Sequence, residues 1–141
     1  MTSTTTHPQT RGQLQRTLAQ KIQKLYKTHI GHSPGKVSCQ VINNTVVVIA
    51  EDSLTKLEKL LIEGEKDDLR PVQVDVEQVR SDLDLAIRPV LVDMLEEILS
   101  FEVVDILSDT TLETGRTAIV VVLSDAPSFK PTEQSVVTAS R

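Results

Sequence analysis

Aromatic side chains are scarce in this chain, which has two Phe, one Tyr and no Trp among its 141 residues. A domain of this length buries about two thirds of the surface that its unfolded chain exposes. The core must therefore be built from Val, Leu and Ile, and few rings remain for stacking on nucleic-acid bases.

Cysteine and long apolar runs are also nearly absent. The single cysteine, Cys39, cannot form an internal disulfide, and its place in an alternating apolar segment predicts a buried and inert thiol. No segment approaches the ~20 apolar residues that a membrane-spanning helix requires, and the start of the chain lacks the apolar run of a signal peptide. We therefore expect a cytoplasmic protein with no direct membrane span.

Acidic residues are missing from the first part of the chain. Residues 1–50 contain six Lys and Arg and no Asp or Glu, whereas residues 51–141 hold all twenty acids and nine bases. This asymmetry makes the sequence a charge dipole and favours contacts of its basic part with anions. The candidate anion contacts are Arg16, Lys24, Lys27 and Lys36. Because no aromatic residues are interleaved with these bases, we do not expect nucleic acid to be the main partner.

The pattern of the first half predicts a helix followed by a hairpin. Apolar residues recur at every third or fourth position over residues 12–30, which is the period of an amphipathic helix. Residues 37–41 then alternate between apolar and polar, and residues 45–50 are apolar on both sides. The Asn43-Asn44 pair between them suits a two-residue turn, so both segments are predicted as strands.

The second half repeats this order at greater length. Asp52 or Ser53 is suited to cap a short helix that Gly64 ends. Pro89 lies inside the following long helix, where we expect it to kink the helix or to split it. The expected elements are a short helix over 54–63, a charged loop over 65–71, a long helix whose apolar stripe covers 76–98, a strand over 102–108, a polar connection over 109–116 and a strand over 117–123.

These elements predict a single α+β domain over residues 10–125, between a disordered tail over 1–9 and a flexible tail over 126–141. Two helix-hairpin repeats give a four-stranded sheet with helices on one face, like a circularly permuted ferredoxin-like fold. Central strands are the more continuously apolar ones. We therefore expect the two hairpins to meet through residues 46–49 and 118–123.

The face of the sheet opposite the helices has no lid in this topology, and apolar side chains on it would form an exposed patch. Such patches usually mark interaction surfaces. The candidate surface residues are Val46, Val47, Val48, Ile49, Ile119, Val120, Val121 and Val122. We predict a non-catalytic interaction or regulatory module that docks through this face, as a homodimer or with a protein partner, unless the tails or the short helix cover it. The alternative is a nucleic-acid or anion-binding domain that uses the basic first helix.

Three short motifs resemble catalytic sequences, but none has the context that its chemistry requires. His29-Ile30-Gly31-His32 spells the HIGH motif of nucleotidyltransferases, yet it closes a helix where that motif opens one. Residues 31–36 resemble a phosphate-binding loop, yet they are one residue short and lead into a strand instead of a helix. No histidine follows Ser108-Asp109 to complete a hydrolytic triad. We predict that the protein is not an enzyme and uses no cofactor or metal.

Four segments, taken together over about residues 11–125, are similar to the MpsC family of small bacterial proteins. They are the helix end and proline loop YKTHIGHSPGKV, the strand VINNTVVVI, the segment LTKLEKLL, and the strand that ends in Ser108-Asp109. The family is named for a component of a sodium-translocating, membrane-potential-generating system and offers no catalytic residues to carry over. The resemblance implies an accessory role beside ion or inorganic-carbon transport machinery. In that family a glycine often ends the long helix, where this chain has Ser100-Phe101.

Overall fold

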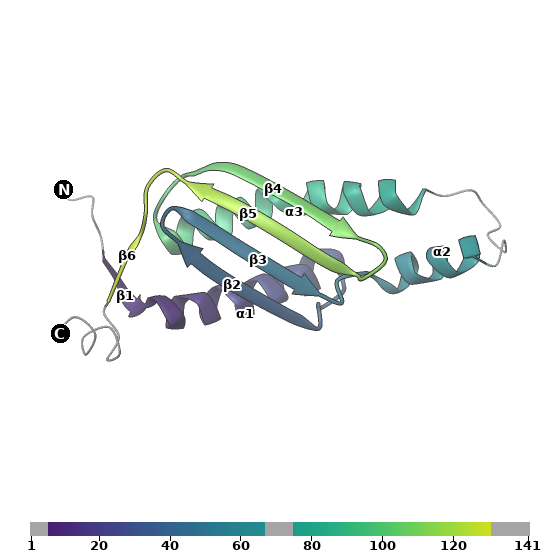
Figure 1. The fold of residues 1–141 in the computed structure, drawn as a ribbon, viewed down its shortest axis with the longest axis horizontal. Helices are drawn as coiled ribbons and strands as arrows, with labels where there is room; N and C mark the ends of the chain where they lie inside the picture. The colour runs from purple at the N-terminus through teal and green to yellow at the C-terminus, as the bar shows by residue number, and fades with distance from the viewer. Residues whose placement is uncertain (1–5, 67–74, 131–141) are drawn as a thin grey trace.

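The computed structural model of the chain describes residues 6–66 and 75–130 (Figure 1). It is an α+β structure with three helices and a four-stranded antiparallel sheet, which confirms the predicted fold class. In chain order the elements are β1 (Thr6–Thr10), α1 (Arg11–Ile30), β2 (Lys36–Ile42), β3 (Thr45–Glu51), α2 (Lys56–Lys66), α3 (Val76–Leu99), β4 (Val103–Thr111), β5 (Arg116–Leu123) and β6 (Ser128–Lys130).

The four-stranded sheet has the order β2-β3-β5-β4, so the second strand of each hairpin is central. Val46 pairs with Val121, and Val48 pairs with Ile119, where β3 meets β5. The predicted junction between the hairpins is therefore confirmed. In Figure 1 the sheet lies in front, α1 runs behind it near β2, and α3 runs behind it near β4. The likeness to a permuted ferredoxin-like fold stays a prediction.

One aliphatic layer fills the space between the two long helices and the sheet. Its residues recur every three or four positions along the helices and every second position along the strands, the periods that put side chains on one face. The least exposed members are Leu14, Leu18, Ile22, Tyr26, Val46, Val48, Leu91, Leu95, Leu99, Ile119, Val121 and Leu123. Tyr26 is the one aromatic ring among them, as the composition leads us to expect.

Helix α1 begins and ends at residues that suit those positions. The Thr10 side chain accepts a hydrogen bond from the Gln13 N–H, and the Gln13 side chain accepts one from the Thr10 N–H, which closes a capping box. Gly31 follows the last turn with a φ of 86°, a left-handed conformation that glycine adopts at little cost. The helix therefore stops at Ile30, and the proline loop leads into β2.

Helix α2 departs from its predicted bounds at both ends. Thr55, rather than Asp52 or Ser53, precedes the first turn and exchanges hydrogen bonds with Glu58. The Ser53 hydroxyl is used inside the core instead, where it donates to the Gly115 carbonyl at 3.0 Å. The helix also continues past Gly64 to Lys66, so the glycine does not end it. Residues 67–71 of the predicted charged loop lie outside the described residues.

Helix α3 continues through Pro89, so the helix is not split there. Proline has no N–H group, so the carbonyl four residues earlier in the helix loses its hydrogen-bond donor. In α3 this is the carbonyl of Leu85. Pro89 is exposed and Leu85 is 53% exposed, so water can take the place of the missing N–H. The following strand, β4, is also longer than predicted, because Asp109 to Thr111 still pair with β5 instead of forming a polar connection.

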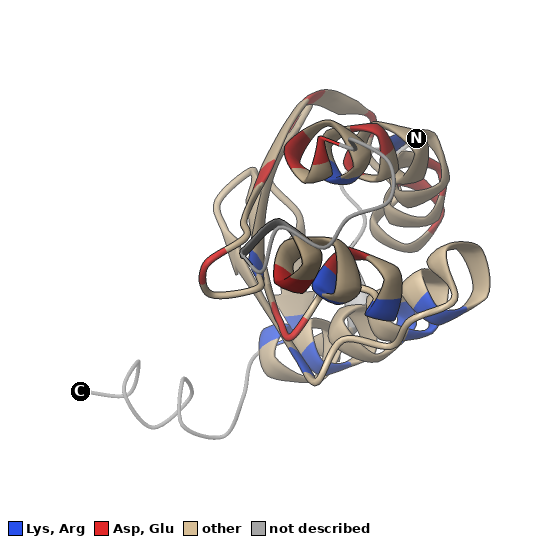
Figure 2. Cartoon of the chain, turned by 90° about the vertical axis from the view of Figure 1, so that its right-hand side faces the viewer, with Lys and Arg blue, Asp and Glu red and all other residues tan. Residues whose placement is uncertain are grey.

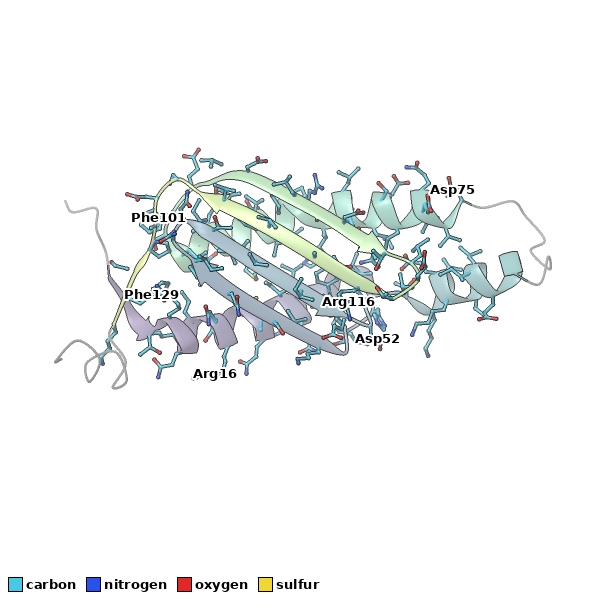
Figure 3. The ribbon with its side chains drawn as sticks, in the orientation of Figure 1. Arg16, Asp52, Asp75, Phe101, Arg116 and Phe129 are labelled. Carbon is cyan, nitrogen blue, oxygen red and sulfur yellow. The ribbon has the colours of Figure 1, made fainter. Side chains whose placement is uncertain are left out.

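Two short segments in the stretches predicted as tails form strands. β1 and β6 pair in parallel beside one end of the main sheet (Figure 1). Phe129 of β6 packs against the core, and the Arg11 guanidinium carbon lies 5.4 Å from the centre of its ring, a cation–π contact. Figure 3 shows Phe129 and Phe101 at the same end of the sheet. Residues 1–5 and 131–141 lie outside the described residues.

Candidate functional site

The sheet face that the helices leave uncovered is apolar at its centre. Side chains alternate between the two faces of a strand, and the register assigns sixteen of them to this face. We name this set the open face: Lys36, Ser38, Gln40 and Ile42 of β2, Thr45, Val47, Ile49 and Glu51 of β3, Arg116, Ala118, Val120 and Val122 of β5, and Asp105, Leu107, Asp109 and Thr111 of β4. Leu107 is 54% and Ile42 is 52% exposed. The described helices do not cover this face, and α2 projects past one end of the sheet instead (Figure 1).

The predicted interaction residues divide between the two faces of the sheet. Four are half-buried members of the open face: Val47, Ile49, Val120 and Val122. The other four point toward the helices and are at most 1% exposed: Val46, Val48, Ile119 and Val121. This second group cannot contact a partner. The prediction was wrong for these four residues for a physical reason. A strand that is apolar on both sides shows no alternation of apolar and polar residues in its sequence, so the sequence does not assign each residue to a face.

Both edge strands have backbone N–H groups that side chains already occupy. Gln15 Oε1 of α1 accepts a hydrogen bond from the Val41 N–H of β2 at 2.9 Å. In β4, Asp105 and Asp109 each accept one from the N–H of the residue that follows them, also at 2.9 Å. Occupied and charged edges oppose the addition of another strand. A partner is therefore better accommodated by the open face than by either edge.

The predicted anion contacts lie on two elements. Arg16, Lys24 and Lys27 are exposed on one side of α1, and Lys36 is exposed at the start of β2. Figure 3 shows Arg16 on the outer side of α1. In Figure 2 the Lys and Arg residues gather along α1 at the bottom, whereas Asp and Glu residues dominate the upper part around α3 and β4. The charge dipole of the sequence is thus also a dipole in space.

A cluster of polar and charged side chains is buried at the end of the core nearest α2. Arg80 donates to Glu58 Oε1 and to Asp84 Oδ1, both at 3.1 Å, and its side chain is only 3% exposed. It also donates to the Ser53 carbonyl at 3.0 Å and to Thr117 Oγ1 at 3.4 Å. Among the described residues, nothing donates to Glu58 Oε2, although it is buried. We name these five residues the ionic cluster.

The ionic cluster contains two carboxylates and only one guanidinium. Burial raises the pKa of the Asp84 carboxyl, and the neighbouring Arg80 charge only partly opposes this shift. The Thr110 hydroxyl donates to Asp84 Oδ2 at 2.9 Å. Burial, followed by the charge of Asp84, also raises the pKa of Tyr26 to about 12. The cluster therefore has one more acid than base, and Asp84 is an acid whose neutral form burial favours.

Sequence reasoning missed the ionic cluster. It predicted an apolar stripe over residues 76–98 of the long helix, whereas the residues of α3 that are buried between Val76 and Ile87 are the charged Arg80 and Asp84. A signal was present, because these two residues have opposite charges, lie one helical turn apart and continue the stripe that includes Ile87. An oppositely charged pair on an apolar stripe is better explained by a buried ion pair than by a solvated face.

A cleft of about 480 Å³ opens beside the ionic cluster, between α3 and β4. Arg80 and Asp84 form part of its lining, and Arg88 lines it one turn further along the helix. The Arg88 Nε and Nη2 atoms donate to Ser108 Oγ at 3.2 and 3.0 Å. The cleft therefore combines charged groups from one helix with hydroxyl groups from an edge strand.

The groups in the motif-like segments have structural partners. His32 Nε2 lies 2.8 Å from the Asp52 carbonyl oxygen, and the Gly35 N–H donates to the Glu51 carbonyl at 2.9 Å, so this donor is not free for a phosphate. Burial raises the pKa of the Cys39 thiol to about 12, which suits an inert side chain. Within residues 6–66 and 75–130, no three His, Cys, Asp or Glu side chains are grouped to hold a metal ion.

By its fold, the chain is a small α+β protein whose sheet has one covered and one open face. It belongs to the MpsC family, because residues 10–125 match the family model described as the Na⁺-translocating membrane potential-generating system (MpsC). This match confirms the resemblance seen in the sequence. Neither the curated proteins nor the solved structures gave a match. In the part of the chain that the structure describes, no helix has the length and hydropathy to cross a bilayer.

Proposed function

We propose that the chain is a non-catalytic, cytoplasmic accessory subunit of a membrane system that transports ions or inorganic carbon, and that it docks through the open face. The family description supports the association with a sodium-translocating system. The observation that carries the docking proposal is the apolar surface of the open face, which has half-buried aliphatic side chains on β3 and β5 and the more than half exposed Leu107 and Ile42 on the edge strands. Large apolar patches of this kind on soluble proteins usually mark interaction sites.

A second copy of the chain is the partner that we propose first. The β2 edge of the open face carries Lys36, and the β4 edge carries Asp109 near the same end of the sheet. A two-fold axis parallel to the strands lays the β2 edge of one copy over the β4 edge of the other, so opposite charges meet twice. The apolar centres then pack face to face, as the two layers of a sheet sandwich do.

A Val120→Lys substitution tests this dimer. Val120 lies at the centre of the open face, next to Leu107 and Val47 of the neighbouring strands. In a two-fold interface, one substitution removes two apolar contacts and places two charges in the interface. We expect the dimer dissociation constant, measured by sedimentation equilibrium, to rise at least about a hundredfold.

The matched control is Ala86→Lys, which adds the same charge at an exposed position of α3, outside the open face. This variant should dimerise like the wild type. A charge-reversed pair, Lys36→Glu with Asp109→Lys, should dimerise more tightly than either single variant. A wild-type chain that stays monomeric at about 1 mM, or a folded Val120→Lys chain that dimerises as tightly as the wild type, would contradict the proposal.

A second candidate function uses the basic side of α1. Arg16, Lys24 and Lys27 are exposed, and within the described residues none of them forms an ion pair. Anionic headgroups and nucleic-acid backbones bind such surfaces in a salt-dependent way. Cosedimentation with anionic vesicles and gel-shift assays with RNA, each at low and high salt, test this alternative. Binding that a triple substitution of these residues by Gln leaves unchanged would refute it.

A further inference from the structure

Arg88 is a half-buried cation that no described acid neutralises. Its two hydrogen bonds both go to Ser108 Oγ, and it takes part in none of the ion pairs among the described residues. A guanidinium has five N–H donors, so one hydroxyl oxygen leaves most of this hydrogen-bonding capacity unused. Arg80, on the same side of α3, differs because it bonds two carboxylates.

The acid closest to Arg88 along the helix is already occupied. Asp84 lies one turn earlier, where an ion pair with Arg88 would be usual. However, Asp84 Oδ1 accepts from Arg80 at 3.1 Å, and Asp84 Oδ2 accepts from the Thr110 hydroxyl at 2.9 Å. Both oxygens of this carboxylate therefore already accept a hydrogen bond. Arg88 is left with a positive charge and free donors beside the cleft.

The cleft has the size and lining of a site for a small molecule. Its volume of about 480 Å³ is within the range that binding pockets usually show. Leu85 and Leu112 add apolar surface to the lining, and Ser108 and Thr110 add hydroxyl groups. A ligand with one anionic group and a short apolar part would find partners for both.

The remaining charges in the lining restrict the charge of such a ligand. Glu77 and Glu113 also line the cleft, and both are exposed. The negative charges of Glu77 and Glu113 repel a phosphate or a dicarboxylate more strongly than a singly charged ligand. The same lining therefore attracts one negative charge through Arg88 and disfavours a second.

We propose that the cleft between α3 and β4 binds a small monocarboxylate. Its carboxylate pairs with the Arg88 guanidinium, whose planar fork matches two carboxylate oxygens. Its short apolar part lies against Leu85 and Leu112. The site is separate from the open face, since Ser108 and Thr110 point to the helix side of β4 whereas Leu107 and Asp109 point to the other side. A dimer through the open face therefore leaves the cleft accessible.

Titration of the full chain with butyrate, followed by ¹H–¹⁵N NMR at constant pH and ionic strength, tests the site. We expect the shift changes to concentrate on the Arg88 Nε–H and on the amides of residues 108–112, and to saturate below about 50 mM. Succinate and phosphate should bind at least about tenfold more weakly than butyrate. Arg88→Gln should weaken butyrate binding at least about tenfold, because it removes a charge-assisted pair.

Arg116→Gln is the matched control, since it removes an exposed guanidinium that pairs with Glu51 at 3.6 Å and does not line the cleft. It should bind butyrate like the wild type. Arg88→Lys keeps the positive charge but loses the planar guanidinium fork, so it should bind butyrate more weakly than the wild type. This variant serves as the test if Arg88→Gln does not fold. No saturable shift at the cleft, equal binding of phosphate and butyrate, or unchanged binding by the folded Arg88 variants would overturn the proposal.

Discussion

The two ends of the layer between helices and sheet are both buried, but different interactions hold them together. At one end α3 contributes Leu95 and Leu99, which are completely buried among aliphatic neighbours. At the other end the same helix contributes Arg80 and Asp84 to the ionic cluster. Truncating a buried aliphatic side chain loses its contacts and leaves an apolar cavity, whereas removing one partner of a buried ion pair leaves an uncompensated buried charge. We therefore expect the ionic end to be the more sensitive to substitution and to pH.

Arg80→Met should have the largest effect on stability. It leaves Glu58 and Asp84 buried without their shared cation, and breaking a buried pair in this way typically costs about 3–5 kcal/mol. Urea denaturation followed by circular dichroism measures the change in the free energy of unfolding. The control is a triple variant that adds Glu58→Gln and Asp84→Asn, which removes the unpaired charges and should recover part of the loss. Equal stability of the single and triple variants would show that charge is not the cause.

Leu95→Ala is the corresponding change at the aliphatic end. Leu95 is completely buried, and a cavity at such a site costs about 2–5 kcal/mol. No ionisable group of the ionic cluster is altered, so the loss measured in urea should be the same at pH 5 and pH 8. A loss that differs between these two pH values by more than about 1 kcal/mol would show that the two ends are coupled.

The pH dependence of the free energy of unfolding should also distinguish the two ends, with a smaller effect than the two substitutions above. Because burial raises the pKa of Asp84 above 3.8, its neutral form is the one that folding favours. The stability from this group is complete below pH 3.8 and is lost as the pH rises through the folded-state pKa. We expect the stability advantage of the wild type over Asp84→Asn to decrease as the pH rises from 4 toward neutrality. An advantage that grows over this range would mean that the Arg80 charge outweighs burial.

The sheet order could be predicted from the sequence because it depends on a property of whole strands. Residues 46–50 of β3 and 118–123 of β5 are continuously apolar. The more continuously apolar strands are expected at the centre of a sheet, and both of these have hydrogen-bonded neighbours on both edges. In these same strands, the sequence could not predict which face of the sheet each side chain lies on. Val120 and Val121 are chemically identical, and only the register shows that the first lies on the open face and the second in the core.

The ionic cluster and the cleft were harder to predict because they depend on distances between separate elements. Glu58 and Arg80 are 22 residues apart, and a segment outside the described residues lies between them. The i,i+4 spacing could have paired Arg80 with Asp84, but the same spacing pairs Asp84 with Arg88 equally well. In the structure the second Asp84 oxygen accepts from the Thr110 hydroxyl, and Arg88 donates to Ser108 instead of pairing with Asp84. Sequence spacing therefore indicates which groups could meet, and the tertiary structure decides which of them do.

The smallest expected effect is a gain in stability at the aliphatic end, where α3 stops. Ser100 follows the last turn with a φ of 63°, a left-handed conformation that strains a residue with a Cβ atom. Ser100→Gly should therefore raise the free energy of unfolding by roughly 0.5 kcal/mol, the relief of strain being partly offset by the greater entropy of glycine in the unfolded chain. Chemical denaturation of Ser100→Gly beside Ser100→Ala, which keeps the Cβ atom, measures this gain. If the alanine variant gains as much as the glycine variant, the left-handed backbone is not the cause.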